Sequence, residues 1–311
     1  MSELVEELRK IPGLTIRLCE PLAPFTSIKI GGPADYLIEA GTEEALARLL
    51  PLLRRHGTAV CFLGNGSNVL VSDLGVRGAV IRLSGEFRRV RWDEEGETVR
   101  ALAGAGCAVT QLVREAARRG YAGLEFAEGI PGSVGGALAM NAGAYGSEFE
   151  RLVDRVEGLS AAGERVRFER GEMRFAYRES NLPPGMIVTR VVLRLAKEDP
   201  ARVSSRVREL VQRRRSSQPA GHPNSGSMFR NPPGDFAGRL VEAAGLKGKR
   251  IGQSQISEKH ANFIVNLGGA KAAEVRRLME LAQAEVKARF GVELQPEVRF
   301  LGEWPEGKPE S

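Results

Sequence analysis

Three short segments carry side chains that could do chemistry on a small molecule. Tyr177-Arg178-Glu179-Ser180 offers a cation, residues 224–232 place the Ser227 hydroxyl in a Gly-rich bend, and residues 294–299 place the Glu297 carboxylate at the start of a predicted strand. An arginine and a carboxylate can stabilise charge that develops in a reaction, and a hydroxyl can deliver a proton. Taken singly, Arg178 and Glu297 are also explained as surface ion-pair residues, and Ser227 as a turn hydroxyl.

Two glycine-rich stretches could bind phosphate through their backbone. Residues 129–137 (Gly-Ile-Pro-Gly-Ser-Val-Gly-Gly-Ala) lead into a predicted short apolar helix. The N–H groups at such a helix start bind phosphate oxygens, and Ser133 would add a hydroxyl. Residues 64–68 (Gly-Asn-Gly-Ser-Asn) follow a predicted strand and could form a second nest. Either stretch alone could be only a tight turn, but together they suggest one long diphosphate ligand held between domains.

Common enzyme templates are absent from the sequence. Gly64-x-Gly66 and Gly104-x-Gly106 both lack the third glycine of the dinucleotide fingerprint, and no P-loop or Gly-x-Ser-x-Gly motif occurs. The three histidines (His56, His222 and His260) lack the spacing of metal ligands, so we expect no metal site.

Composition narrows the class of protein further. The 311 residues are 42% apolar and 27% charged, which indicates a globular protein of two or three packed units. Glycine stands out at 37 residues, about 12% against a usual ~7%. Lys and Arg number 45 and Asp and Glu 39, a net charge of +6 that is interspersed along the chain. This pattern argues only weakly for nucleic acid and suits an anionic small molecule equally well.

Several features predict a cytoplasmic protein. No apolar run approaches the ~20 residues of a membrane span, and the acidic N-terminus excludes a secretory signal peptide. Cys19, Cys61 and Cys107 are odd in number and have no close pair, which favours buried thiols in a reducing compartment.

The periodicity of apolar residues predicts alternating helices and strands in three segments. Up to residue 83 it predicts a helix from the N-cap Thr42 to Gly57, a buried strand at 59–63, and strands at 69–72 and 78–83. The second segment is expected to hold hairpins at 90–103 and 155–168, helices at 109–119 and 201–215, and a strand at 186–195. The third should hold helices at 237–244 and 272–289 and strands at 261–266 and 296–300.

Taken in order, the motifs closely resemble the UDP-N-acetylenolpyruvoylglucosamine reductases (UDP-N-acetylmuramate dehydrogenases, the MurB family), flavoenzymes of bacterial peptidoglycan precursor synthesis. The resemblance runs from about residue 20 to residue 302. It is carried by residues 26–35, 63–73, 123–146, Tyr177-Arg178-x-Ser180, Gly226-Ser227-x-Phe229-x-Asn-Pro232, 260–266 and 296–299.

The resemblance implies an α+β fold: a three-domain flavoprotein with vanillyl-alcohol-oxidase-type (PCMH-type) FAD-binding domains and a smaller α/β substrate-binding domain. The expected domains are residues 1–83 joined by 296–311, residues 84–216, and residues 217–295. FAD would lie, without a covalent link, between the first two domains.

The implied reaction reduces UDP-N-acetylglucosamine enolpyruvate to UDP-N-acetylmuramate, with NADPH as the hydride donor. A hydride goes to the enolpyruvyl methylene carbon and a proton to the adjacent carbon. No nucleic acid and no membrane insertion are implied.

Residue by residue, the resemblance makes Arg178 and Glu297 the charge-stabilising pair, with Glu297 either protonated or bridged to Arg178, and it makes Ser227 the proton donor. It implies FAD contacts from Gly64, Asn65, Gly66, Ser67, Asn68, Gly129, Ile130, Pro131, Gly132, Ser133, Gly135, Gly136, Asn141 and Gly143. It implies substrate contacts from Tyr177, Asn231 and Gln255.

The chain departs from the family pattern at Ser217-Gln218-Pro219, where many relatives have Lys-Gln-Pro. Arg215 or Arg230 could supply the missing cation. The third segment is short, which resembles the form without an extra substrate-binding insertion. A related FAD-linked oxidase and a non-enzymatic nucleotide-binding module are the rival interpretations.

Overall fold

The computed structural model describes residues 3–304, which form two compact units. Unit 1 comprises the N-terminal segment through Arg17, Leu37–Gly64 and Ala79–Arg214. Unit 2 comprises Leu18–Tyr36, Asn65–Gly78 and the segment that starts at Arg215. Each unit has its own apolar core.

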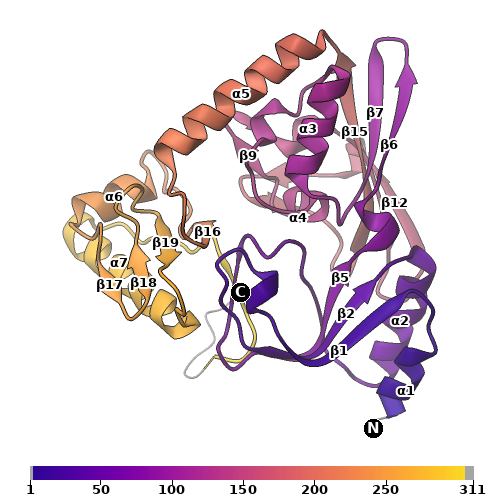
Figure 1. Ribbon diagram of the computed structural model, residues 1–311, viewed down its shortest axis with the longest axis horizontal. Coiled ribbons are helices and arrows are strands. Elements are labelled where there is room, and N and C mark those ends of the chain that lie inside the picture. Colours follow the sequence, from indigo (N-terminus) through magenta and orange to yellow (C-terminus); the bar gives the residue numbers. More distant parts are fainter. Residues whose placement is uncertain (1–2, 305–311) are drawn as a thin grey trace. The chain divides into compact units, whose positions relative to one another are not determined.

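The main sheet of unit 1 is antiparallel and is covered on one face by two helices. Its strands run in the order β12 (Arg165–Glu169), β11 (Val153–Leu159), β15 (Ile187–Lys197), β7 (Thr98–Gly104) and β6 (Val90–Glu95), and β8 (Tyr121–Ala122) also pairs with β15. Helices α3 (Val109–Arg119) and α4 (Val134–Ala139) pack on the apolar face (Figure 1). Helix α3 ends where Gly120 adopts a left-handed conformation with φ of 75°.

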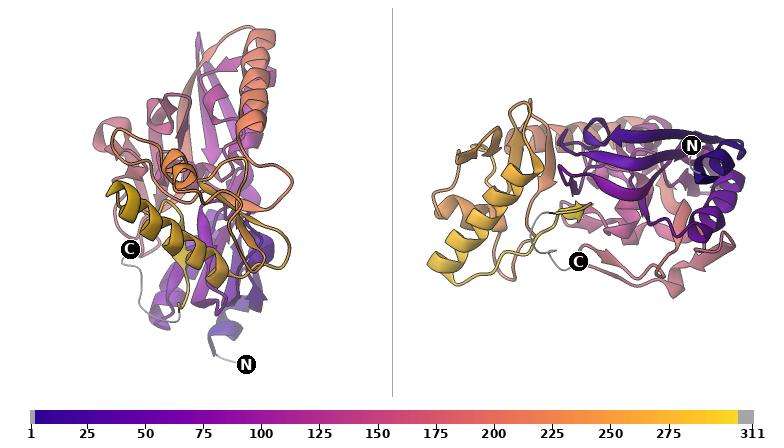
Figure 2. Two further views of the ribbon diagram at one scale, coloured as in Figure 1. Left: turned by 90° about the vertical axis from the view of Figure 1, so that its left-hand side faces the viewer. Right: turned by 90° about the horizontal axis from the view of Figure 1, so that it is seen from below.

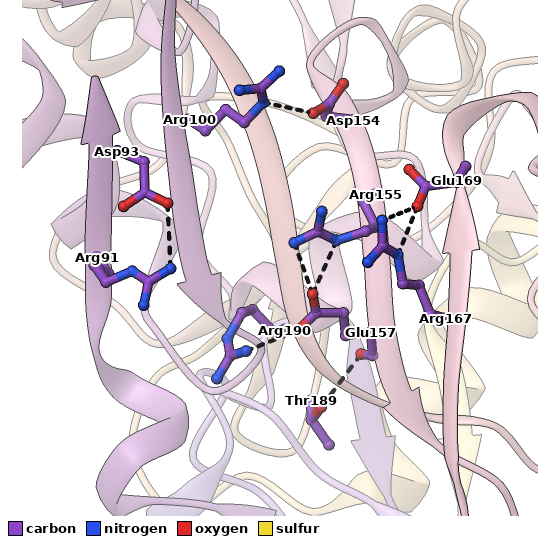
Figure 3. A network of polar contacts seen from close by, with 10 residues as sticks. All are labelled: Arg91, Asp93, Arg100, Asp154, Arg155, Glu157, Arg167, Glu169, Thr189 and Arg190. Carbon is purple, nitrogen blue, oxygen red and sulfur yellow. Dashed lines mark hydrogen bonds and ion pairs between the residues drawn. The ribbon is translucent and has the colours of Figure 1, made fainter. Parts of the chain in front are cut away.

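A network of charged side chains covers strands of the same sheet (Figure 3). Arg100 Nε donates to Asp154 at 3.1 Å, and Arg190 Nη1 donates to Glu157 at 2.8 Å. In β11 the charged residues Asp154, Arg155 and Glu157 stand between the buried Val153, Val156 and Leu159, and the pairing of β11 with β15 shifts register between Val153 and Arg155. Such exposed pairs add little stability singly and keep this face polar.

A second sheet in the chain contains β1 (Leu14–Pro21), β2 (Pro33–Ala40), β5 (Val76–Leu83) and β3 (Val60–Phe62), in that order. Helices α1 (Glu3–Arg9) and α2 (Glu43–Arg55) also belong to unit 1. As predicted, Thr42 caps α2: its hydroxyl oxygen accepts a hydrogen bond from Ala45 N at 3.1 Å.

The prediction of a buried strand at 59–63 was wrong about burial. Among residues 3–304, strand β3 pairs with β5 alone, and the side chains of Val60 and Phe62 are 41% and 38% exposed. Residues two apart share one face of a strand, and this face is open. A short, continuous apolar run cannot distinguish a strand covered on both faces from one covered on a single face.

Unit 2 is built on a four-stranded antiparallel sheet. The strand order is β16 (Asn224–Ser227), β19 (Phe263–Asn266), β18 (Ser254–Ile256) and β17 (Arg250–Ile251). Helices α6 (Ala237–Ala243) and α7 (Ala272–Phe290) pack with the sheet around Leu240, Val275 and Leu278 (Figure 2). A parallel pair, β4 (Val69–Val71) and β20 (Arg299–Leu301), completes this unit.

Short elements connect these layers. The two-stranded hairpins are β9 (Gly143–Ala144) with β10 (Ser147–Glu148), and β13 (Phe175–Ala176) with β14 (Glu179–Ser180). Single 3₁₀ turns lie at Ala23–Phe25, Gly85–Arg88, Glu125–Ala127, Phe149–Arg151 and Arg170–Glu172.

Most predicted elements are confirmed, including α3, α7 and the hairpins β6–β7 and β11–β12. Helix α5 (Pro200–Ser217) forms where a helix was predicted, but its apolar face is more exposed than expected. Of the apolar residues on that face, only Val203 is fully buried. The division into three domains stays a prediction, although β20 does pair with β4 of the first predicted domain. No helix within residues 3–304 is both long and apolar enough to cross a membrane.

Candidate functional site

In unit 2, neighbouring backbone segments carry the predicted serine and glutamate. Glu297 N donates to Met228 O at 2.8 Å, and Arg230 N donates to Gln295 O at 2.9 Å. Phe229 and Pro296 form the antiparallel bridge between these two hydrogen bonds. The fold therefore brings Ser227 and Glu297 onto adjacent segments, although they lie far apart in sequence.

Ser227 ends strand β16 in a tightly held bend. Gly226 has a φ of 75°, which favours glycine, and its N–H donates to Asn224 Oδ1 at 3.1 Å. The neighbouring Ser225 hydroxyl donates to Val69 O at 3.2 Å. Ser227 itself is half-buried, and its hydroxyl makes no hydrogen bond with residues 3–304. The bend is thus fixed by the residues next to Ser227 and not by its own hydroxyl.

Asn68 holds the segment that carries Glu297. Asn68 Nδ2 donates to Glu297 O at 3.1 Å, and Arg299 N donates to Asn68 O at 3.0 Å. Asn68 was predicted as an FAD contact from its place in the glycine-rich stretch. Its side-chain amide instead positions Glu297, and a contact with FAD stays a prediction.

Arg178 lies in unit 1, at the tip of the β13–β14 hairpin. Tyr177 and Arg178 form its two-residue turn, and Arg178 has a φ of 61°, which is uncommon for a residue other than glycine. The guanidinium carbon lies 5.1 Å from the centroid of the Tyr177 ring. Ser180 Oγ donates to Ala139 O at 3.1 Å, which anchors the hairpin to the end of α4. Strained backbone of this kind is often found at functional sites.

The glycine-rich stretch of unit 1 forms the predicted turn and helix start. Ser133 is the N-cap of α4, and its hydroxyl oxygen accepts from Gly136 N at 3.3 Å. A Cβ on Gly136 would meet only Ser133 Oγ, at 3.4 Å, so this side of the helix start is open. A Cβ on Gly135 would lie 3.0 Å from Ala105 Cβ, so Gly135 is explained by packing without any phosphate.

Two further residues border this helix start. A Cβ on Gly64 would clash with Ser133 Oγ, so parts of both predicted nests meet within unit 1. Arg214 passes beside Gly129, and Arg214 Nη1 donates to Glu128 O at 3.3 Å. Burial lowers the pKa of the Arg214 guanidinium, and the nearby Tyr145 and Glu128 oppose that shift. The first N–H groups of α4 already have partners within the protein, since Val134 N donates to Cys107 O and Gly135 N donates to Ala105 O, both at 2.9 Å. The Ser133 hydroxyl and the Arg214 guanidinium could still bind a phosphate here, and their contact with the pyrophosphate of FAD stays a prediction.

Arg214, the cation beside this helix start, was not singled out from the sequence. The run Arg213–Arg215 was the available signal, but its arginines were assigned to a solvated helix face. The burial of Arg214 and its contacts with Gly129 and Glu128 become visible only in the structure.

Other predicted FAD contacts have structural partners within the protein. Asn141 is fully buried: its Nδ2 donates to Glu148 Oε2 at 2.8 Å and its Oδ1 accepts from Glu150 N at 3.0 Å. A Cβ on Gly143 would lie 2.7 Å from Ser147 O across the β9–β10 hairpin. Gly66 has a φ of 61°, and its carbonyl accepts from Ser27 N at 2.9 Å. Contacts of these residues with FAD, and those of Asn65, Ser67, Ile130, Pro131 and Gly132, stay predictions.

The predicted substrate contacts lie in both units. Tyr177 of unit 1 is 46% exposed. In unit 2, Asn231 Oδ1 accepts from Ala237 N at 3.1 Å at the start of α6, and Gln255 Nε2 donates to Gly248 O at 3.1 Å. Nothing in residues 3–304 gathers three or more metal-ligating side chains.

Comparison with known proteins defines first the class and then the family. Residues 34–169 match the family described as "FAD binding domain", which makes the chain an FAD-dependent flavoprotein. Residues 218–301 match "UDP-N-acetylenolpyruvoylglucosamine reductase, C-terminal domain". The chain belongs to the UDP-N-acetylenolpyruvoylglucosamine reductase family.

Its similarity to relatives extends over nearly the full length. UDP-N-acetylenolpyruvoylglucosamine reductase 2 of Symbiobacterium thermophilum is 49% identical over 98% of this chain and 99% of the relative. The reductase of Rubrobacter xylanophilus is 49% identical over 91% of this chain and 94% of its own. The crystal structure of UDP-N-acetylenolpyruvylglucosamine reductase from Thermus caldophilus matches with a TM-score of 0.79 and 40% identity, covering 93% of this chain and 98% of that one.

Proposed function

We propose that this chain reduces UDP-N-acetylglucosamine enolpyruvate to UDP-N-acetylmuramate with NADPH and FAD, using Ser227, Glu297 and Arg178 as its reacting and charge-stabilising residues. The reaction follows from the family to which nearly the whole chain belongs. The observation that carries the residue assignment is the hydrogen bond from Glu297 N to Met228 O, which sets the serine and glutamate segments side by side.

FAD, when bound, supplies hydride transfer from NADPH to the substrate. Gly136 leaves the start of α4 open, while Ser133 and Arg214 offer a hydroxyl and a cation beside it. These groups would hold the pyrophosphate of the cofactor.

The chain's own contribution to the reaction is to stabilise negative charge and to donate a proton. Hydride addition to the enolpyruvyl methylene breaks the π bond of the C=C group, leaves a single bond, and places negative charge on the adjacent carbon and its carboxylate. We assign stabilisation of this charge to the Arg178 guanidinium and to Glu297 as a protonated hydrogen-bond donor, because an ionised carboxylate would repel it. The Ser227 hydroxyl donates its proton to the adjacent carbon, and solvent then restores that proton.

We place the enzyme in the cytoplasm. All three cysteines lie within the described residues as free thiols, which suits a reducing compartment. NADPH and a nucleotide-linked sugar are also intracellular compounds. Fractionation of the native host, followed by immunodetection, would test this placement.

Replacement of Ser227 by alanine tests the assignment, because the two half-reactions can be followed separately under anaerobic conditions. Bleaching of the flavin by NADPH needs no proton at the substrate carbon and should be nearly unchanged. Return of the yellow colour on adding UDP-N-acetylglucosamine enolpyruvate should slow by roughly 10²–10⁴-fold, the usual contribution of a general acid.

Ser225→Ala is the matched control, since Ser225 lies in the same bend and bonds only to backbone. It should leave both half-reactions close to wild type. Near-wild-type return of colour in Ser227→Ala would remove Ser227 from the site. A wild-type protein whose colour does not return with this substrate would refute the reaction itself.

A further inference from the structure

The backbone of Phe229, two residues after Ser227, has a different neighbour on each of its two edges: Pro296 on one and the side chain of Asn262 on the other. The hydrogen bonds on either side of its bridge with Pro296 are made by Arg230 N and Glu297 N. In an antiparallel pair this pattern turns the N–H and C=O of Phe229 itself toward the opposite edge. The side chain of Asn262 lies at that edge: its Oδ1 accepts from Phe229 N at 2.9 Å, and its Nδ2 donates to Phe229 O at 2.8 Å.

Asn262 continues the hydrogen bonding of strand β19 beyond the end of that strand. Backbone pairing with β16 reaches Ser227 opposite Phe263, and Met228 N then donates to Asn262 O at 2.8 Å. Beyond this point the chain turns, since Phe263 N donates to His260 O at 3.0 Å. The amide side chain of Asn262 therefore makes the two hydrogen bonds to Phe229 that the backbone of a further strand residue would make.

The arrangement is buried in unit 2. Asn262 and Phe229 are 3% and 2% exposed, so unpaired polar groups here would be costly. Asn262 N donates to His260 Nδ1 at 3.2 Å, which fixes the backbone that carries the amide. Burial lowers the pKa of the His260 ring, which keeps Nδ1 available as an acceptor.

We propose that Asn262 is a positioning residue for proton donation: by holding Phe229, it fixes the spacing between the Ser227 segment and the Glu297 segment. The inference rests on the proposed role of Ser227. Asn262 acts through the backbone, because Phe229 is joined to Met228, whose carbonyl accepts the N–H of Glu297. A shift of about 1 Å at a reacting group is enough to slow a reaction by ~100-fold.

The test compares Asn262→Ala with Asn266→Ala. Asn266 is an equally buried asparagine at the other end of β19; its side chain donates to Ile28 O at 2.9 Å and accepts from Gly268 N at 2.8 Å. Substrate-driven return of flavin colour should fall by roughly 10–100-fold in Asn262→Ala. Bleaching by NADPH should be nearly unchanged, and Asn266→Ala should change neither rate beyond its effect on stability.

Two further measurements separate positioning from general destabilisation. The double variant Ser227→Ala/Asn262→Ala should be no slower than Ser227→Ala, because residues that act as a unit are not additive. Amide hydrogen exchange of residues 228–230 should accelerate in Asn262→Ala, even in FAD-free protein, and should remain protected in Asn266→Ala. Asn262→Asp keeps the acceptor for Phe229 N and loses the donor to Phe229 O, so it provides the same comparison if the alanine variant does not fold.

Return of colour in Asn262→Ala or Asn262→Asp as fast as in Asn266→Ala would overturn the inference. A double variant much slower than Ser227→Ala would also overturn it, since Asn262 would then act independently of the serine. In both cases the wild-type and Ser227→Ala results would stand unchanged. Failure of the proposed function would instead be seen in the wild-type protein.

Discussion

At the residue scale, the adjacent glycines Gly135 and Gly136 have different reasons to lack a side chain. Gly135 packs against Ala105, whereas Gly136 faces open space at the start of α4. We expect Gly136→Val to fold but to lose FAD, because its side chain would occupy the space where pyrophosphate approaches the backbone. Flavin absorbance after gel filtration measures the FAD that the variant retains, and the melting temperature of the FAD-free protein shows whether the variant folds.

Gly135→Val is the matched comparison. It should lower the melting temperature of the FAD-free protein itself, since overpacking of a filled site costs about 1–3 kcal/mol. A Gly136→Val protein that retains a full complement of FAD would show that the phosphate site lies elsewhere.

The three cysteines should differ sharply in reactivity. Burial raises the pKa of the Cys61 thiol to about 11 and that of Cys107 to about 11, whereas Cys19 is exposed. At pH 8, below these raised values, Cys61 and Cys107 are almost entirely protonated, and the protonated thiol is a poor nucleophile. We expect one thiol to react rapidly with Ellman's reagent in native protein and three after unfolding in guanidinium chloride. Substitution of Cys19 by serine should abolish the rapid phase, and its persistence would contradict this ranking.

At the element scale, the long helix α7 receives a cap from a distant part of unit 2. The two carboxylate oxygens of Asp73 accept from Ala272 N at 2.8 Å and from Ala273 N at 3.0 Å. These are N–H groups that a helix cannot satisfy internally, and the negative charge also suits the helix dipole.

Asp73→Ala should therefore lower the free energy of unfolding by about 1–2 kcal/mol. Urea denaturation followed by circular dichroism measures the change. Asp93→Ala, which removes an exposed ion pair with Arg91, should have a much smaller effect and serves as the control. Equal losses in the two variants would mean that the cap does not stabilise α7.

At the scale of the whole molecule, the cofactor should be held without a covalent bond. Residues 64–68 and 129–137 contain neither cysteine nor histidine, and the nearby Cys107 is fully buried with its thiol directed to Ala108 O. Acid precipitation should release all of the yellow colour into the supernatant as FAD. Colour that stays with the pellet would refute non-covalent binding.

The sequence alone determined the features that depend on neighbours in the chain. The cap at Thr42, the left-handed Gly120 that ends α3, and the hairpin β6–β7 are set by steric and hydrogen-bonding preferences within a few residues. The order of the motifs likewise identified the family, and with it the reaction and the residues to examine.

Only the tertiary structure decided how these local features are used. It showed that β3 has an open face, and that Gly135 packs closely against Ala105. It also directed the amides of Asn68 and Asn262 to the segments of Glu297 and Ser227. A buried backbone group must find a partner, but that partner can come from any part of the chain. Which one it is depends on the packing of the complete unit, so no local pattern in the sequence specifies it.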